Sequence, residues 1–174
     1  MTLPLRYYGD PILRKRGQEI AVFDEELKQF AETLIQTMYA NPAAGLAAPQ
    51  VGRSIRMFAR RNFIVKENGW IEYTDAQIFI NPRITVLSDE LQEEDEGCLS
   101  IPGLRANVIR PMHIRVEAFD QHGNPFTEEL EGYKARIVMH ENDHINGVLF
   151  IDRVNVHDRK KIDAELRAIK KKYS

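Results

Sequence analysis

The chain is organised around Arg136-Ile137-Val138-Met139-His140-Glu141-Asn142-Asp143-His144-Ile145-Asn146-Gly147, near its C-terminal end. This stretch predicts a helix, because it contains no proline and Gly147 follows its last turn. His140 and His144 are four residues apart and therefore share one face of that helix, with Glu141 in the same narrow arc. Two imidazoles at this spacing are typical ligands of a divalent cation, and the carboxylate beside them can exchange a proton with a water on that cation. A chance pair of surface histidines is the weaker interpretation, because the chain has only five histidines and two of them fall at this spacing around a glutamate.

The composition is that of a globular protein. At 174 residues with a formal net charge of −2, the chain is long enough for a core and favours no single strong electrostatic partner. It has no apolar run near 18 residues, and its first residues lack the apolar core of a signal peptide. Cys98 is the single cysteine, which excludes an internal disulfide and suits a reducing compartment. We therefore expect one domain spanning residues 1–174, in the cytoplasm.

Three helical segments are expected besides the histidine helix. Asp10 and Pro11 predict a short helical turn, and Asp24 predicts the cap of a longer helix that ends near Tyr39. The last helix begins near Asp158 and carries an apolar stripe. Residues 153–174 hold eight Lys/Arg against three Asp/Glu, a formal +5 that leaves −7 on the rest of the chain. The stripe of the last helix consists of Ile162, Leu166 and Ile169.

Strand patterns fill most of the middle of the chain. The segments 53–59, 77–80, 83–87 and 113–118 are short and rich in β-formers, and Pro82 is expected at a strand end. The segment 66–70 is interpreted as an exposed connection in which Trp70 packs. Hairpin-linked strands with helices before and after them predict an α+β fold. We expect antiparallel sheets wrapped around the central metal-binding helix, with an N-terminal helix and a C-terminal amphipathic helix.

Two further segments draw attention. Small residues at 43–48 let backbone approach something closely, either a packed neighbour or a ligand. Glu96-Gly97-Cys98-Leu99-Ser100 follows an acidic run that is most simply a solvated edge. A lone cysteine is often a small buried hydrophobe, yet Cys98 is also the only thiolate that could complete the ligand set of the two histidines.

Several classes of protein use a His-Glu-x-x-His helix, and the third ligand distinguishes them. One class of zinc protease has a third histidine six residues on, where this chain has Phe150, so that class is excluded. Another takes a glutamate from a second helix, for which Glu165 is a formal candidate on a peripheral basic helix. A structural zinc site usually has four protein ligands, whereas three are credible here. An open coordination position favours catalysis, and a zinc protease remains the alternative function.

Three segments in this order resemble the signature motifs of the peptide deformylase family. They are Gly45-Leu46-Ala47-Ala48-Pro49-Gln50, Glu96-Gly97-Cys98-Leu99-Ser100 and His140-Glu141-Asn142-Asp143-His144, and the similarity runs nearly from end to end of the chain. The resemblance implies a hydrolase that removes the N-formyl group from the initiator methionine of nascent polypeptides and releases formate.

By this resemblance, Cys98, His140 and His144 hold one divalent metal ion, and Glu141 is the general acid/base. A water bound to the metal would attack the formyl carbon while Glu141 takes up its proton and passes it to the departing amine. The resemblance implies ferrous iron in the cell, replaceable by nickel, cobalt or zinc, although two imidazoles and a thiolate alone would suggest zinc.

The resemblance also implies how the substrate is held. The side-chain amide of Gln50 and the backbone N–H of Leu99 would stabilise the oxyanion. Because glycines permit close approach of backbone, we expect an extended substrate to pair with Ala44-Gly45 on one side and with Gly97 on the other. The methionine side chain would enter a pocket bordered by Ala44, Tyr133, Ile137 and His140.

The chain departs from the family pattern at one place near this pocket. The family usually has Gly-Val-Gly-Leu where this chain has Ala43-Ala44-Gly45-Leu46, so the side chain at position 44 is smaller. We therefore expect bulkier first residues to be accepted somewhat better. The basic C-terminal helix is expected either to be a solvated cap or to dock on the polyanionic surface of the ribosome, and no membrane is expected as a partner.

Overall fold

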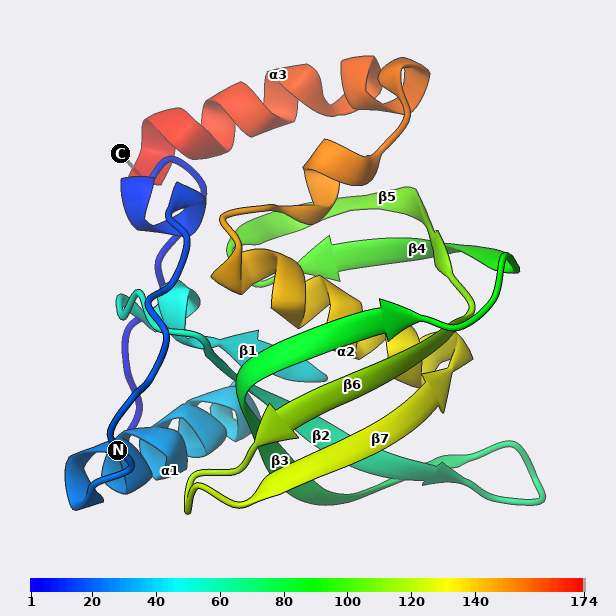
Figure 1. The fold of residues 1–174 in the computed structure, drawn as a ribbon. Coiled ribbons are helices and arrows are strands. Elements are labelled where there is room, and N and C mark those ends of the chain that lie inside the picture. The colour runs from blue at the N-terminus through cyan, green and yellow to red at the C-terminus, as the bar shows by residue number, and fades with distance from the viewer. Residues whose placement is uncertain (174) are drawn as a thin grey trace.

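Two antiparallel sheets enclose one helix in the computed structural model, which describes residues 1–173 (Figure 1). The larger sheet has the strand order β1-β2-β3-β6-β7, and the smaller one pairs β4 with β5. Helix α2 lies between the sheets, so the expected α+β architecture is confirmed. The strands are β1 (Gly45–Ala47), β2 (Met57–Val65), β3 (Ile71–Val86), β4 (Leu91–Cys98), β5 (Ile101–Pro111), β6 (His113–Phe119) and β7 (Pro125–Glu131). The helices are α1 (Glu25–Ala40), α2 (Gly132–Ile145) and α3 (Val156–Tyr173), with short 3-10 turns η1 (Pro11–Arg14), η2 (Ala48–Val51) and η3 (Phe150–Arg153).

Helix α2 is held by packing on its apolar face. Ala135, Val138 and Ile145 are fully buried against the larger sheet, where the rings of Phe58 and Phe79 stack 4.8 Å apart. The helix ends as predicted, because Gly147 has a φ of 74°, a left-handed conformation that glycine adopts at low cost.

The N-terminal elements also begin as predicted. Asp10 accepts a hydrogen bond from the Ile12 N–H at the start of η1, and Asp24 accepts one from the Leu27 N–H at the start of α1. The apolar face of α1 packs on the far side of the larger sheet from α2, and its buried residues are Leu27, Ala31, Leu34 and Met38.

Two strand predictions and one prediction about a connecting loop are wrong in detail. The strand expected over 53–59 is β2, which begins at Met57 and not at Arg53 and runs on to Val65. The two segments on either side of Pro82 form a single strand, β3, in which the register shifts between Ile80 and Arg83. Proline cannot donate to a ladder, and such a bulge is where a continuous strand accommodates it. Trp70 does not pack, because it is 72% exposed at the tip of the β2–β3 hairpin.

Helix α3 packs at the end of the molecule opposite α1, over β5 and the N-terminal segment (Figure 1). It begins at Val156, two residues before the predicted start. Leu166 is 3% exposed and packs with Ile162 and Ile169 into a cluster that includes Leu13 and Phe150, so the apolar stripe is confirmed. Within residues 1–173, no helix is both long and apolar enough to cross a membrane.

Candidate active site

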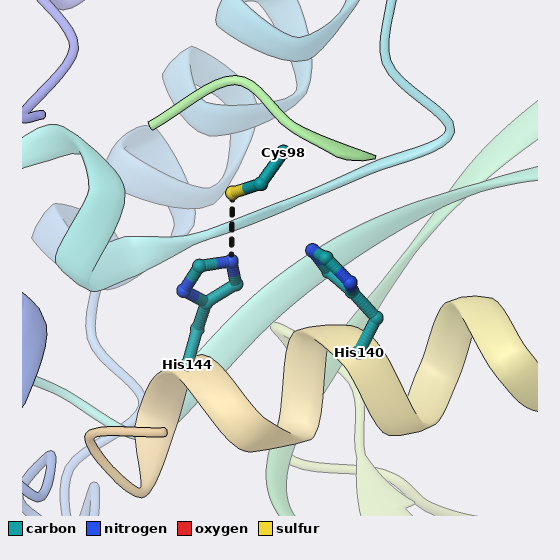
Figure 2. A group of neighbouring side chains, drawn as sticks. All are labelled: Cys98, His140 and His144. Carbon is teal, nitrogen blue, oxygen red and sulfur yellow. Dashed lines mark hydrogen bonds between the residues drawn. The ribbon is translucent and has the colours of Figure 1, made fainter. Parts of the chain in front are cut away.

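Three side chains with metal-ligating atoms meet above the middle of α2. The ligand atoms of Cys98, His140 and His144 all lie within 4.8 Å of one another. Figure 2 shows the two imidazoles projecting from α2 toward the sulfur of Cys98. Cys98 belongs to β4 of the smaller sheet. The Cys98 Sγ lies 3.4 Å from the Nε2 of His144. The structure thus brings together the three residues that the sequence singled out as metal ligands.

The β4–β5 hairpin places the thiol. Cys98 is the last residue of β4 and pairs with Ile101, after a register shift at Gly97. Ile101 and Val108 of β5 are fully buried in the cluster beneath α3, which anchors this small sheet against the rest of the chain. The sulfur is therefore carried over the helix by a packed hairpin and not by a mobile loop.

A buried carboxylate that sequence reasoning missed orients His140. Glu96 is 5% exposed, and its Oε1 lies 2.8 Å from the Nδ1 of His140. A carboxylate at Nδ1 holds the ring in the tautomer that leaves Nε2 free for a metal. Burial opposes the charge of Glu96, but hydrogen bonds from Arg110 and His140 outweigh it and hold the pKa of the carboxyl well below its usual range. Glu96 is thus an anion that contacts His140 on the side away from Nε2. The acidic run that precedes it is exposed to solvent, as predicted.

Arginines neutralise this buried charge. Arg110 donates to both oxygens of Glu96, at 2.6 and 2.9 Å, and to the carboxylate of Asp143 at 3.0 Å. Arg136 of α2 also donates to Glu96, and Arg153 donates to Asp143 at 2.6 and 2.8 Å. Two of these charged residues, Arg136 and Asp143, lie within the histidine helix. Both occupy positions of that helix that are buried, and a charged residue among positions expected to be buried is the signal that could have identified them.

Glu141 lies beside the ligands without a fixed partner. It is 3% exposed, its Oε1 lies 3.9 Å from the Nε2 of His140, and its Oε2 has no hydrogen-bond partner within residues 1–173. Burial raises the pKa of Glu141 to about 7, with the positive charge of His140 opposing the shift. A carboxyl group with a pKa near neutrality can both accept and donate a proton at physiological pH.

Gln50 is held in place from both ends of its amide. Its Oε1 accepts a hydrogen bond of 2.9 Å from the Ala47 N–H, and its Nε2 donates to the Ser100 hydroxyl at 3.1 Å. The same Nε2 lies 3.5 Å from the Cys98 sulfur. The amide N–H groups therefore reach the thiol from the side of η2.

A cavity of about 520 Å³ opens onto these groups. All but one of the residues predicted for catalysis, metal binding or substrate binding line its wall. His144 is the exception, because it lies 1% exposed beneath Cys98. The predicted residues on the wall are Ala44, Gly45, Gln50, Gly97, Cys98, Leu99, Tyr133, Ile137, His140 and Glu141.

Gly45 meets a packed neighbour, one of the two possibilities left open by the sequence. A Cβ at this position would lie 2.8 Å from the Cγ of Glu141, so only glycine lets β1 run this close to α2. Ala44 precedes it at the cavity wall, and its carbonyl accepts a hydrogen bond of 2.8 Å from the Arg61 N–H. The small residues here thus let the helix approach the sheet at the base of the cavity.

The donor set suits a divalent metal ion. Two imidazoles and one thiolate within 4.8 Å of one another make three ligands of a tetrahedral site and leave one position open. Burial lowers the pKa of His144, which keeps its imidazole neutral. Burial acts in the same direction on His140, but hydrogen bonds with Cys98 and Glu96 outweigh it and raise its pKa, so a cation would displace a proton there.

Comparisons with known proteins agree with one another. The family model described as "Polypeptide deformylase" matches residues 2–160. A peptide deformylase of Chlorobaculum tepidum is 39% identical, with 97% of this chain and 88% of that protein covered. Peptide deformylase 1B of Arabidopsis thaliana, described as chloroplastic/mitochondrial, is 39% identical over 95% of this chain and 59% of its own length. The crystal structure of peptide deformylase from Thermus thermophilus is 38% identical, with a TM-score of 0.87 over 99% of both chains.

Proposed function

This chain belongs to the polypeptide deformylase family, and we propose that Glu141 carries the protons of its reaction. The protein is a metal-dependent hydrolase that removes the formyl group from nascent peptides. The observation that carries the assignment of Glu141 is its position, buried 3.9 Å from His140 with one carboxylate oxygen unpartnered within residues 1–173. The zinc-protease alternative is not favoured, because Glu165 is exposed on α3 and takes no part in the ligand cluster.

Cys98, His140 and His144 would hold one divalent metal ion, which we propose to be ferrous iron in the cell. When bound, such an ion supplies Lewis acidity, which makes water a better nucleophile and the formyl carbonyl a better electrophile. The three ligand atoms support a metal site, and the choice of iron over zinc, nickel or cobalt rests on the family resemblance. Metal analysis of protein purified without oxygen tests this choice.

Glu141 would act twice in each turnover. It first accepts a proton from the water whose oxygen attacks the formyl carbon. It then donates that proton to the nitrogen of the departing amine as the carbon–nitrogen bond breaks, which leaves formate and a free N-terminus. A pKa of about 7 supports both steps, because neither protonation state is strongly disfavoured at neutral pH.

Gln50 and Leu99 would stabilise the negative charge that develops on the formyl oxygen. The Gln50 amide is already aligned by Ala47 and Ser100, so little reorganisation is needed when charge develops. The backbone N–H of Leu99 would be the second donor from the cavity wall. In comparable sites the loss of one such donor costs about 3–4 kcal/mol of transition-state stabilisation.

The substrate would lie extended between the two sheets. Its backbone would pair with Ala44-Gly45 on one side and with Gly97 on the other, since strand addition is a common mode of peptide binding. Its first side chain would enter the part of the cavity bordered by Ala44, Tyr133 and Ile137. We expect Ala44→Val to narrow the pocket and to raise the preference for methionine over phenylalanine at the first position. An unchanged ratio of kcat/KM values for the two peptides would reject this assignment of the pocket.

We further propose a single catalytic domain that works in the cytoplasm and meets its substrates at the ribosome. The apolar side of α3 is packed, so its basic residues are left to face outward. A surface of this kind can bind the phosphates of ribosomal RNA. The outward-facing lysines are Lys160, Lys161, Lys170, Lys171 and Lys172.

Release of formate from a formyl-Met-Ala-Ser peptide is the direct test of the activity. The metal-loaded protein should release one formate and one free amine per peptide. A matched acetyl-Met-Ala-Ser peptide is the control, because the acetyl group places a methyl where the formyl group has only hydrogen. Cleavage of an internal peptide bond with the formyl group intact would instead support the protease alternative.

A further inference from the structure

A chain of contacts leads from the protein surface to His140, and its outermost member has no part in the proposed reaction. Arg153 belongs to η3, in the connection between α2 and α3, and its side chain is 45% exposed. Its Nε lies 2.6 Å from the Oδ2 of Asp143, and its Nη2 lies 2.8 Å from the Oδ1. Arg153 thus binds both oxygens of this carboxylate, although within residues 1–173 it is not part of the cavity wall.

Asp143 connects this surface arginine to a buried one. Its Oδ2 accepts the hydrogen bond from Arg153 and another, of 3.0 Å, from the Nη1 of Arg110. Arg110 is 3% exposed, and its Nε and Nη2 donate to Glu96 at 2.6 and 2.9 Å. The Oε1 of Glu96 then lies 2.8 Å from the Nδ1 of His140. Four contacts therefore link a partly exposed guanidinium to a predicted metal ligand.

Arg110 is shared between two buried carboxylates, Glu96 and Asp143, which are each at most 5% exposed. Glu96 has a second cation, because Arg136 also donates to it. For Asp143 the second cation is Arg153. Without Arg153, Asp143 would depend on Arg110 alone, and a buried charge that is short of a partner attracts the remaining one strongly. Arg110 would then shift toward Asp143 and away from Glu96.

We propose that Arg153 is a positioning residue for the metal site. By compensating the charge of Asp143, it keeps Arg110 on Glu96. Glu96 in turn holds the His140 ring in the orientation that leaves Nε2 to the metal. The inference rests on the proposed function, since it presumes that His140 binds a metal. It makes the strength of metal binding depend on a side chain at the outer surface of the protein.

Two effects of Arg153 on the metal oppose each other. Its positive charge repels a divalent cation, so its removal would favour metal binding. That repulsion is weak, because water and salt screen a side chain that is 45% exposed, and we expect it to change the affinity by about twofold. Loss of a group that orients a metal ligand weakens metal binding by roughly 10–100-fold. Because Arg153 acts on His140 through other residues, we expect the lower end of that range, a net loss of about tenfold.

The test compares Arg153→Met with Arg14→Met in the full chain. Arg14 is the matched control, because it binds both oxygens of Asp152, at 2.6 and 3.2 Å, and its side chain is 42% exposed. The measured quantity is the dissociation constant for cobalt(II), obtained by competition with a chelator. We expect Arg153→Met to raise this constant about tenfold and Arg14→Met to leave it within about twofold of the parent. Equal constants for the two variants, or tighter binding in Arg153→Met, would overturn the proposal.

A double-mutant cycle tests whether the effect passes through Asp143. Asp143→Asn keeps the shape of the side chain but removes the charge that Arg153 compensates. In this background Arg153→Met should change the dissociation constant by less than about twofold, since no carboxylate remains at position 143 to draw Arg110 away. A loss of about tenfold that persisted in Asp143→Asn would contradict the proposed route.

Arg153→Lys gives an independent result that does not require Asp143→Asn to fold. Lysine keeps a positive charge beside Asp143, so the dissociation constant should stay within about threefold of the parent. A lysine variant that bound cobalt(II) as weakly as Arg153→Met would show that compensation of Asp143 is not what Arg153 contributes.

Metal affinity separates this proposal from the proposed function, because it does not depend on turnover. A loss of affinity in Arg153→Met but not in Arg14→Met would support the proposal even if no peptide released formate. Unchanged affinity would reject it even if formate release were normal. With cobalt(II) at saturation, KM of Arg153→Met for formyl-Met-Ala-Ser should stay within about twofold of the parent, and a larger rise would contradict a role confined to the metal site.

Discussion

Helices α2 and α3 carry their charges in opposite ways. In α2 three charged side chains face inward, and Arg136, Glu141 and Asp143 are each at most 5% exposed, whereas Lys134 in the first turn is exposed. In α3 the single buried residue is Leu166, and the ion pair between Lys161 and Asp158 is a surface contact of 3.5 Å. Of these two helices, the one that carries His140 and His144 is therefore the one with buried charges.

The difference follows from the partners that each helix meets. The charges of α2 are matched by Glu96 and Arg110, which come from the two strands of the smaller sheet. Inside a protein, each such group costs several kcal/mol to desolvate, and Arg136 and Asp143 are tolerated there because each is paired with an opposite charge. The charges of α3 stay in water, where pairing contributes little. Buried charge therefore fixes the position of the site, while exposed charge is available for a partner.

Removing a partner from the buried network should have the largest effect on stability. Arg110→Met leaves the carboxylates of Glu96 and Asp143 short of a cation, and we expect it to lower the free energy of unfolding by about 3–5 kcal/mol in urea titrations. Lys161→Met breaks the surface ion pair of α3 and should change the free energy of unfolding by less than about 0.5 kcal/mol. Equal effects of the two variants would contradict the contrast between the helices.

An intermediate case sharpens the comparison. Arg14 of η1 forms a bidentate ion pair with Asp152 of η3, with N···O distances of 2.6 and 3.2 Å. Both side chains are partly exposed. Burial opposes the charge of Asp152, but the hydrogen bond from Arg14 outweighs it and lowers the pKa of the carboxyl. A carboxyl with a lowered folded-state pKa stabilises the protein above its unfolded pKa, and this contribution is lost as pH falls through the folded value.

Arg14→Met should therefore cost about 0.5–1 kcal/mol at pH 7 and progressively less below pH ~4, where Asp152 is protonated in the unfolded chain. Thermal unfolding of the parent and the variant from about pH 3 to about pH 7 measures the difference. A cost that stayed constant over this range would assign the effect to lost packing of the arginine stem and not to the ion pair.

Charge on α3 should matter least for peptide turnover. Truncation of α3 is a poor test, because it would also remove Leu166 from its buried cluster. Replacement of Lys170, Lys171 and Lys172 by glutamine keeps the packed stripe and should leave hydrolysis of a short formyl peptide within about twofold. The same variant should bind ribosomes more weakly and reduce the slope of log K against log salt by roughly one unit per lost phosphate contact. Unchanged ribosome binding at low salt would discard the docking idea.

The two helices also differ in how far they could be predicted. The stripe of α3 and the His-Glu-x-x-His face of α2 are local patterns, and both were predicted correctly. Glu96 and Arg110 are separated by 14 residues in sequence and meet across a hairpin, so no local period reveals that they face inward together. Strand β3 was divided at Pro82 for a similar reason, because a bulge depends on pairing with a distant strand. Glu96 and Arg110, which contacts across the hairpin bury, are the part of this site that local reasoning could not reach.

The central claim is that Glu141 moves protons while the cysteine and histidines hold the metal, and Glu141→Gln tests it most directly. The amide occupies the same space but cannot carry the proton. We expect this variant to bind as much metal as the parent and to lose about 10²–10⁴-fold in kcat for formate release. Cys98→Ala is the reciprocal control, and it should lose the metal itself. Near-parental kcat in metal-loaded Glu141→Gln would contradict the account.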